Sequence, residues 1–294
     1  MHNVESILGK IKLFNGAGQL TCEPLNGGYS NHTYKVTADG KNYVLRVNGG
    51  QNSFLKLSRA GEISALQQAS GCAPKVYGDE NFEEYLVTEF CPGHLVTREE
   101  AHTPEIILEY TGLLKRIHSI QGVSRECSPF YLIRSYMEGA AHHKVVIPDG
   151  FMEYFKKADE IERQSASTSQ YTKRYCHNDI YNINTLNDNG TLTAIDWELS
   201  GVGDIFFDLA TISYSNNYSP EEDGLLLQGY FGTIEPEHRI YLHSMKYMNM
   251  LRDITWGLLH SAINQSAVNH NFDNYGFAVG MFERLKAGLV TMHD

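Results

Sequence analysis

The segment YCHNDIYNINTLNDNGTLTAIDWE, residues 175–198, contains polar side chains whose types and spacing could carry out chemistry. His177, Asp179 and Asn184 are close together in its first half, and Asp196 stands near its end. Between the two groups, an Asn-Gly turn flanked by the stretches INTL and TLTAID predicts a β-hairpin. Because the two open ends of a hairpin lie at the same edge, the pattern predicts that Asp179 and Asp196 share one cleft.

This combination of residues fits phosphoryl transfer, whose transition state requires positioning and neutralisation of charge. One carboxylate would orient the attacking hydroxyl, while an amide and a second carboxylate would hold magnesium on the phosphates. The alternative is that Asp179 and Asp188 only cap turns, which is a common use of a single aspartate. The joint spacing of these residues favours the catalytic interpretation.

The composition is that of a globular protein with an acidic balance. The chain has 294 residues, of which 42% are hydrophobic, so it can build a sizeable core and two lobes. The formal net charge of -11 argues against a non-specific nucleic-acid binder and suits a cationic ligand.

Cysteine usage and hydropathy indicate the compartment. The five cysteines are odd in number and include no C-x-x-C pair, so they predict neither a disulfide framework nor a zinc site. No apolar run reaches the roughly 18 residues of a membrane span. Charged residues at Glu5, Lys10 and Lys12 also interrupt the region where a signal peptide would have its apolar core. We therefore expect a cytoplasmic protein without membrane insertion.

The elements that must position these residues begin with a small α+β unit. In NHTYKVTADGKNYVLRV, residues 31–47, an Asp-Gly pair between two segments rich in Tyr, Val and Thr predicts a hairpin. Alternation along its second arm places Arg46 on a defined face of the sheet. A helix carrying Glu62 is predicted over residues 58–69, and YLVTEF at 85–90 reads as a buried strand.

Beyond residue 90 the composition becomes helical. The Pro-Gly pair of CPGH marks a connection, so we place a boundary between a nucleotide-binding lobe at 1–90 and a catalytic and substrate-binding lobe at 91–294. Thr103 before Pro104 predicts a capped helix with proline at its first position. The polar run RQSASTSQ at 163–170 is expected to form a surface loop.

Two motifs give the chain a family resemblance. HNDIYNIN and IDWELSGVGDIFFDLA resemble the catalytic loop and the metal-aspartate segment of the kinase-like small-molecule phosphotransferases, which include aminoglycoside phosphotransferases and choline and ethanolamine kinases. The resemblance implies a bilobal, protein-kinase-like α+β fold that uses ATP and Mg²⁺. It also implies that Asp179 is the catalytic base and that Asn184 and Asp196 bind the magnesium ion.

The resemblance extends over nearly the whole chain. NGGYSNHTYKV, residues 26–36, resembles the turn that covers the nucleotide, which implies a nucleotide contact for Asn31. In YVLRV, Arg46 stands where protein kinases have a lysine, as it does in many choline-kinase-like proteins. The resemblance therefore implies that Arg46 contacts phosphate and that Glu62 is its helix-borne partner.

Departures from protein kinases narrow the substrate class. Asp196 is followed by Trp-Glu instead of Phe-Gly, and no A-P-E segment follows, so a protein substrate is not expected. By the resemblance, Asp204 and Asp208 brace the catalytic loop from a neighbouring helix. His177 is expected to stabilise that loop and not to act as a base.

A predicted helix near residues 246–264 carries the clearest information about the substrate. Helical spacing separates an apolar stripe from a second stripe that contains Asp253 and Trp256. A tryptophan beside a carboxylate suits an organic cation, although Trp256 could equally pack against another helix. Choline-kinase-like proteins, which this region resembles, place aromatic residues around the trimethylammonium group there. Glu198 would add a carboxylate to the same pocket or pair with a basic side chain nearby.

These expectations combine into a predicted function. The chain would be an ATP- and magnesium-dependent kinase that phosphorylates a small cationic alcohol, choline first and ethanolamine close behind. An aminoglycoside or thiamine is the alternative substrate. The competing class is a non-catalytic, nucleotide-binding pseudokinase. The presence of Asp179, Asn184, Asp196 and Arg46 argues against it, since a pseudokinase normally lacks one of them.

Overall fold

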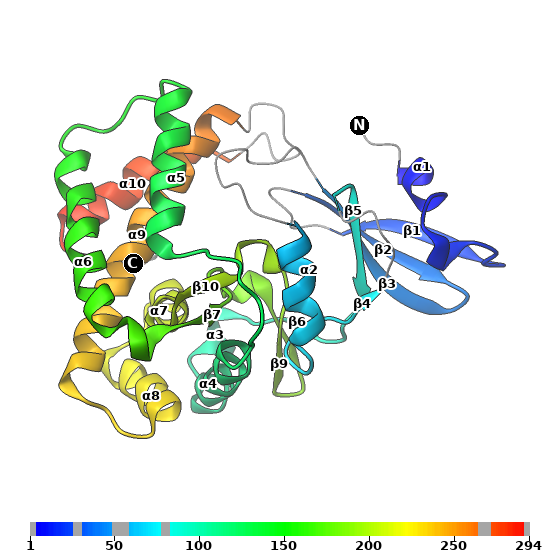
Figure 1. The fold of residues 1–294 in the computed structure, drawn as a ribbon, viewed down its shortest axis with the longest axis horizontal. Helices are drawn as coiled ribbons and strands as arrows, with labels where there is room; N and C mark the ends of the chain where they lie inside the picture. The colour runs from blue at the N-terminus through cyan, green and yellow to red at the C-terminus, as the bar shows by residue number, and fades with distance from the viewer. Residues whose placement is uncertain (1–3, 26–30, 49–58, 78–82, 264–271, 291–294) are drawn as a thin grey trace.

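The chain folds into a sheet-containing lobe and a larger, mainly helical lobe (Figure 1). The computed structural model describes residues 4–25, 31–48, 59–77, 83–263 and 272–290. Residues 26–30, which hold the glycines of the predicted nucleotide-covering turn, lie outside the described part. The predicted α+β class with a small sheet lobe and a helical lobe is confirmed.

The first lobe is built on a five-stranded antiparallel sheet in the order β1-β2-β3-β5-β4. The strands are β1 (Leu20–Leu25), β2 (His32–Ala38), β3 (Lys41–Val47), β4 (Val76–Tyr77) and β5 (Tyr85–Glu89). The predicted hairpin is β2–β3, in which Ala38 pairs with Lys41. Asp39 and Gly40 between them have φ of 48° and 79°, the left-handed values that a two-residue turn of this type requires.

The two faces of this sheet are covered differently. Alternation along β3 buries Tyr43, Leu45 and Val47, whose cluster includes Ile7 and Phe14 from α1 (Val4–Leu8) and η1 (Lys12–Phe14). Arg46 points to the other face, as its position in the alternation predicts. There its side chain contacts Glu62 of α2.

Helix α2 (Arg59–Gln68) connects the lobes. Its buried residues Ile63, Ala65 and Leu66 belong to the large hydrophobic core of the helical lobe. Just after the helix, the Cys72 carbonyl accepts a hydrogen bond of 2.9 Å from the Ala194 N–H. The helix carrying Glu62 is therefore fixed to the segment that leads to Asp196.

Two small sheets frame the polar segment of the helical lobe. One has the order β6-β8-β9, from β6 (His94–Leu95), β8 (Thr185–Asp188) and β9 (Thr191–Ala194). The other pairs β7 (Lys173–Cys176) with β10 (Gly201–Asp204). Gly93 permits the close approach of β6, because a Cβ at that position would lie 2.4 Å from the Asn187 carbonyl oxygen. Since β5 belongs to the first sheet and β6 to this one, we propose to keep the boundary at residue 90.

Helices make up the rest of the second lobe (Figure 1). They are α3 (Arg98–Ala101), α4 (Pro104–His118), α5 (Pro129–His142), α6 (Phe151–Thr172), α7 (Ile205–Asn216), α8 (Pro220–Phe231), α9 (Pro236–Ile263) and α10 (Asn274–Lys286). The predicted start of α4 is confirmed: Thr103 Oγ1 accepts the Ile106 N–H and Pro104 takes the first helical position. None of the described helices combines the length and apolar character needed to cross a membrane.

The expected surface loop at 163–170 is wrong, because these residues continue α6 to Thr172. Serine and threonine are only moderate helix formers, and that composition suggested a loop. In the structure, the Ser165 hydroxyl donates to Asp204 Oδ2 at 2.5 Å, and the Thr172 hydroxyl donates to the same oxygen at 3.1 Å. These contacts with a residue distant in sequence favour the helix over the local preference.

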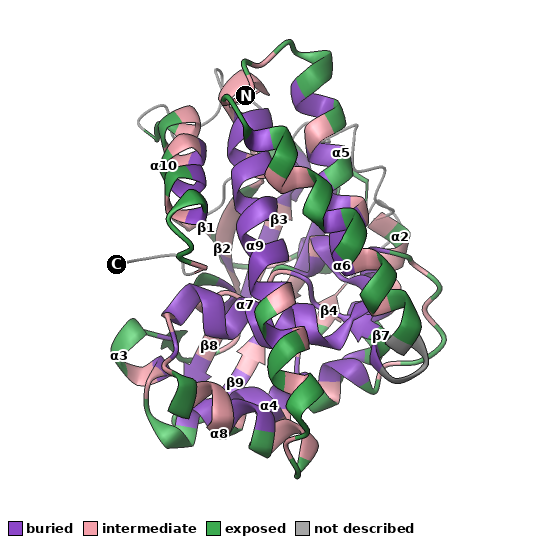
Figure 2. Cartoon of the chain, turned by 90° about the vertical axis from the view of Figure 1, so that its left-hand side faces the viewer, coloured by how far each residue is buried: buried purple, intermediate pink, exposed green. Residues whose placement is uncertain are grey.

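Helix α9 starts at Pro236, ten residues earlier than the range predicted from its pattern. Helix α9 is buried over most of its length in the middle of the lobe (Figure 2). Both predicted stripes are buried between residues 245 and 260, where only Trp256 is partly exposed. The polar stripe therefore faces other protein groups. Its carboxylate and its arginine neighbour must be paired inside the lobe.

Candidate active site

The loop between β7 and η2 (Asn182–Asn184) is fixed by hydrogen bonds at its backbone. The Asp208 carboxylate accepts the N–H groups of His177 at 2.8 Å and Asn178 at 2.7 Å. Asn178 adopts φ of 63°, a conformation that Asn tolerates better than most residues. Its side-chain amide donates to the carbonyls of Cys127 at 2.8 Å and Leu199 at 3.0 Å. The loop is thus held in one conformation on the side opposite to Asp179.

Of the two aspartates expected to brace this loop, only Asp208 does so. Its carboxylate also accepts a hydrogen bond from His118 Nε2 at 3.1 Å. Asp204 instead caps α7 by accepting the Phe206 N–H at 2.9 Å, and it ties α6 to this point. The expectation for Asp204 was wrong because its position next to the first residue of α7 makes it an N-cap.

His177 stabilises the loop, as expected. The ring is fully buried, donates from Nε2 to the Ile195 carbonyl at 3.1 Å, and packs edge-on against Trp197. Burial lowers the pKa of His177 to about 4, so the imidazole is neutral at pH 7. The ring therefore ties the loop to the strand end that carries Asp196.

Asp179 lies at the mouth of the loop between two donors. The Asn184 amide donates to Oδ2 at 2.8 Å, and Arg252 Nη1 lies 3.3 Å from Oδ1. Burial raises the pKa of Asp179 to about 6, while the charge of Arg252 opposes that rise. The side chain is 25% exposed, so one edge of the carboxylate can meet a ligand.

Asp196 occupies a strained backbone position at the other end of the hairpin. Its φ and ψ of 60° and 71° are left-handed, which costs a residue other than glycine roughly 1 kcal/mol and is typical of functional sites. The carboxylate is 40% exposed and thus faces the opening. Loss of solvent around the carboxyl group, and then the charge of Glu198, raise the pKa of Asp196, while the charge of Arg46 opposes the rise. The Ile195 N–H, next to Asp196, donates to the Asn184 carbonyl at 2.9 Å, and the Asn184 amide contacts Asp179, so the ends of the hairpin bring the two aspartates to the same cleft.

The sheet lobe contributes a fixed cation. Arg46 forms two hydrogen bonds of 2.7 Å with the two oxygens of Glu62, in a bidentate pair. Arg59 Nη1 lies 3.3 Å from the same carboxylate. Burial alone would raise the pKa of Glu62, but the charges and hydrogen bonds of Arg46 and then Arg59 lower it. Arg46 Nη1 also lies 3.5 Å from Asp196 Oδ1, so the two lobes meet at this point.

Glu198 pairs with a basic side chain, which is one of the two roles expected for it. Its Oε2 accepts the Asn31 side-chain amide at 3.0 Å and lies 3.3 Å from Arg59 Nη1. Asn31, Arg59 and Glu198 thus form a connection between the sheet lobe and η3 (Trp197–Leu199). The short turn after Asp196 directs Glu198 toward this connection, and its contribution to a substrate pocket stays a prediction.

Asp253 is a buried carboxylate with several donors. The hydroxyl groups of Tyr181 and Tyr214 each donate to it at 2.9 Å. Arg252 Nε donates to Oδ1 at 3.2 Å. Asp253 therefore positions two tyrosines and an arginine directly behind Asp179.

Trp256 forms a half-buried aromatic surface. Its ring stacks on His260 with centroids 4.4 Å apart, and Phe277 of α10 meets it edge-on at 6.3 Å. Burial lowers the pKa of His260 to about 4, so the stack is uncharged at pH 7. A neutral aromatic wall of this kind can receive an organic cation.

Arg252 is a functional candidate that the sequence analysis missed. The guanidinium group donates to the Asn178 carbonyl at 3.0 Å, contacts Asp179 and Asp253, and lies over the Tyr181 ring at 4.7 Å. The side chain is only 4% exposed. An arginine next to an aspartate in MNMLRDITW, a stretch predicted to be helical, was the available signal, because a buried arginine needs paired acids.

The donor set of the cleft fits a hard divalent cation. Asn184 uses its amide nitrogen on Asp179, so its amide oxygen and the Asp196 carboxylate are the atoms that could hold the ion. Mg²⁺ prefers oxygen ligands, and its positive charge would favour the ionised form of the Asp196 carboxylate, whose pKa is raised without the ion. A second cluster, His118, Cys176 and Asp208, is less suitable, because burial keeps the Cys176 thiol protonated by raising its pKa well above the usual value.

Comparisons with known proteins agree with this geometry. The phosphotransferase enzyme family matches residues 21–241. Choline kinase B1 of Caenorhabditis elegans is 26% identical over 207 residues, which cover 63% of this chain and 54% of that protein. The thiamine kinase of Escherichia coli O157:H7 is 23% identical over 195 residues, 65% of either chain. The chain thus spans between half and two thirds of the length of these two relatives.

A solved structure resembles the whole fold. The choline/ethanolamine kinase family protein from Mesorhizobium loti superposes with a TM-score of 0.77 at 25% identity, covering 97% of this chain and 92% of that one. The family match begins in β1 and ends within α9, so it includes both Arg46 and the hairpin with its two aspartates. The resemblance predicted from the motifs is confirmed, and the chain belongs to the phosphotransferase enzyme family.

Proposed function

We propose that the protein transfers the γ-phosphoryl group of ATP to the hydroxyl of a small cationic alcohol, with a magnesium ion in the cleft. One observation carries the proposal. Asp179 contacts Asn184, whose carbonyl accepts the N–H of the residue before Asp196, and Asp196 lies 3.5 Å from Arg46, which is paired with Glu62. A cation on one wall and oxygen donors on the other suit a nucleotide phosphate with its metal.

Each residue of the cleft then has a defined task. Asp179 would accept a hydrogen bond from the substrate hydroxyl and orient its oxygen, because Asn184 and Arg252 fix the carboxylate from behind. Asn184 and Asp196 would hold Mg²⁺. Bound there, the ion would neutralise charge on the phosphates.

The nucleotide side of the cleft rests on the sheet lobe. Arg46 would contact a phosphate while Glu62 keeps its guanidinium in place. Asn31 follows the predicted nucleotide-covering segment in the sequence and contacts Glu198, so it would help to close the lobe over the nucleotide.

We propose choline as the preferred substrate and ethanolamine as the next. The support is the neutral Trp256–His260 stack near the buried carboxylate of Asp253, an arrangement that favours a quaternary ammonium group. The similarity to Choline kinase B1 points the same way. Thiamine, the substrate in the name of another relative, is also a cationic alcohol and is the main alternative, ahead of an aminoglycoside.

A substrate panel tests the proposal. Purified protein is assayed with ATP and Mg²⁺ on choline, ethanolamine, thiamine and an aminoglycoside, with Asp179→Asn as the inactive control. We expect the highest kcat/KM on choline. A higher kcat/KM on thiamine than on choline would make thiamine the preferred substrate in place of choline. Tight ATP binding without turnover of any alcohol would favour the pseudokinase class instead.

A further inference from the structure

An open groove lies outside the candidate active site, at the junction of α4, β7, β10, α7 and α8. Its volume is about 600 Å³. Ligand pockets for small organic molecules typically measure about 300 to 1,000 Å³, so the groove has the size of a binding site.

The groove combines an apolar, aromatic lining with cations at its rim. Tyr230, Phe231 and Val202 contribute apolar surface, and the basic side chains are Lys115, Lys173 and Arg174. No aspartate or glutamate is among the described residues that line it. In a chain with a net charge of -11, a ligand-sized groove of this composition is selective for anions.

The three cations differ in how firmly they are engaged. The Lys115 ammonium donates to the Gly229 carbonyl at 2.8 Å and so satisfies the end of α8. Lys173 contacts Glu126 at 3.1 Å, but both side chains are more than half exposed, and such pairs contribute little. Arg174 donates through Nη1 to the Lys173 carbonyl at 2.8 Å. Lys173 and Arg174 can therefore turn toward an anion at low cost.

The inner wall of the groove is preformed. The Tyr230 hydroxyl lies 2.6 Å from His118 Nδ1, and His118 Nε2 donates to Asp208, the residue that braces the catalytic loop. The Tyr230 ring also packs edge-on against Phe231, with centroids 4.8 Å apart. A wall fixed in this way loses little conformational entropy when a ligand binds.

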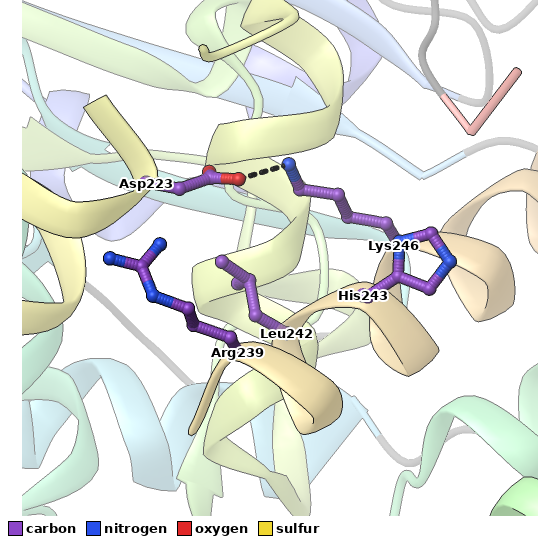
Figure 3. A pocket seen from close by; sticks show the side chains of 5 residues that line it. All are labelled: Asp223, Arg239, Leu242, His243 and Lys246. Atoms are coloured by element: carbon purple, nitrogen blue, oxygen red, sulfur yellow. Dashed lines mark hydrogen bonds and ion pairs between the residues drawn. The ribbon is translucent and has the colours of Figure 1, made fainter. Parts of the chain in front are cut away.

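A second cavity, between α8 and α9, lacks these properties (Figure 3). It measures about 60 Å³ and is lined by Asp223, Arg239, Leu242, His243 and Lys246. Lys246 and Asp223 form an ion pair of 2.6 Å across it. A space of this size holds water molecules and no organic ligand. Its exposed Arg239 provides a matched control for Arg174 of the groove.

We propose that the groove at α4, β7 and α8 binds a small organic anion with an aromatic or aliphatic body. The anionic group would lie against Lys173 and Arg174, and the apolar body would lie along Tyr230 and Phe231. Such a ligand is chemically unlike the cationic alcohol of the active site, so the two ligands would not compete for one site.

A fluorescence titration tests the proposal. The probe is anilinonaphthalene sulfonate, an aromatic anion that fluoresces in apolar surroundings, and saturating ADP with Mg²⁺ keeps the nucleotide cleft filled. We expect one saturable site. Arg174→Glu should weaken it about tenfold or more, which corresponds to losing a hydrogen bond between charged groups. The control Arg239→Glu should leave the affinity unchanged within about twofold, because Arg239 does not line the groove and solvent and salt screen its exposed charge.

Several outcomes would overturn the proposal. They are equal affinities in Arg174→Glu and the parent, and an equal loss in Arg239→Glu. ADP affinity measured on each variant verifies that the fold and the cleft are intact, and Arg174→Gln replaces the charge reversal if that variant does not fold. Binding to phosphatidylglycerol vesicles without binding of the free probe would assign the groove to a lipid surface and also reject the proposal.

Discussion

The two walls of the catalytic cleft are held by different forces. On the helical side, the loop carrying Asp179 is fixed through backbone groups that donate to the buried Asp208. On the sheet side, Arg46 and Arg59 are fixed by ion pairs between long side chains. Backbone hydrogen bonds to a buried carboxylate leave one geometry, whereas side-chain ion pairs can exchange partners. The comparison suggests that the helical wall is preorganised for the hydroxyl and that the sheet wall adapts to the nucleotide.

Removing the charge of Asp179, the proposed base, should give the largest effect. Asp179→Asn keeps the shape and the contact with Asn184 but loses the charge that orients the hydroxyl. We expect kcat to fall by about 10²- to 10⁴-fold, the usual range for a catalytic acid or base. ADP affinity, measured by calorimetry, should stay within about twofold of the parent, since a residue that acts only on the acceptor contributes no ground-state nucleotide contact. Turnover near that of the parent would remove Asp179 from its role.

The helical wall can be tested by changing Asp208, whose carboxylate holds the loop. In Asp208→Asn, one carboxylate oxygen becomes an NH₂ group that cannot accept a backbone N–H, so a buried donor loses its partner. We expect about 3 kcal/mol of lost unfolding free energy, measured by urea denaturation.

The matched control is Asp204→Asn, in the same turn. Asparagine caps helices nearly as well as aspartate, and the Ser165 and Thr172 hydroxyls can turn to accept hydrogen bonds from its NH₂ group, so this variant should lose less than about 1 kcal/mol. Equal losses in the two variants would show that the loop is not held by Asp208, and the contrast between the two walls would then fail.

Local chemistry explains what the sequence could predict about these walls. Turn residues and alternation identify the hairpin between Asp179 and Asp196, and the face of β3 that carries Arg46, because these features depend on neighbouring residues. The contacts of Arg252 and Arg59 join segments separated by 73 and 139 residues, and no local pattern encodes such distances. The helix at 163–170 was missed for the same reason.

The adaptable wall can be tested with Arg46→Lys. Lysine keeps the charge but cannot form the bidentate pair with Glu62. We expect the KM for ATP to rise about tenfold, because one hydrogen bond to a charged group is lost, while kcat changes less. Steady-state kinetics with varied ATP measure both constants.

Arg59→Lys is the control on the same wall. Its ammonium can still reach Glu198, so the KM for ATP should change by less than about threefold, as is usual for partly exposed pairs. If Arg46→Lys lowered kcat and left the KM for ATP unchanged, the sheet wall would act on the chemistry and not on nucleotide binding.

The smallest expected effect concerns the substrate wall, where Trp256 stacks on His260. An aromatic ring over a cation is worth about 0.5 to 2 kcal/mol, so Trp256→Ala should raise the KM for choline about two- to thirtyfold and leave the KM for ATP unchanged. Trp256→Phe keeps a ring and should lose less. The control substrate is the uncharged tert-butyl analogue of choline, which has the same shape without the charge. The parent should prefer choline over this analogue, and the preference should shrink in Trp256→Ala because only the cation gains from the ring. If the preference stays the same, Trp256 is a packing residue, and the selectivity must come from the carboxylates behind Asp179.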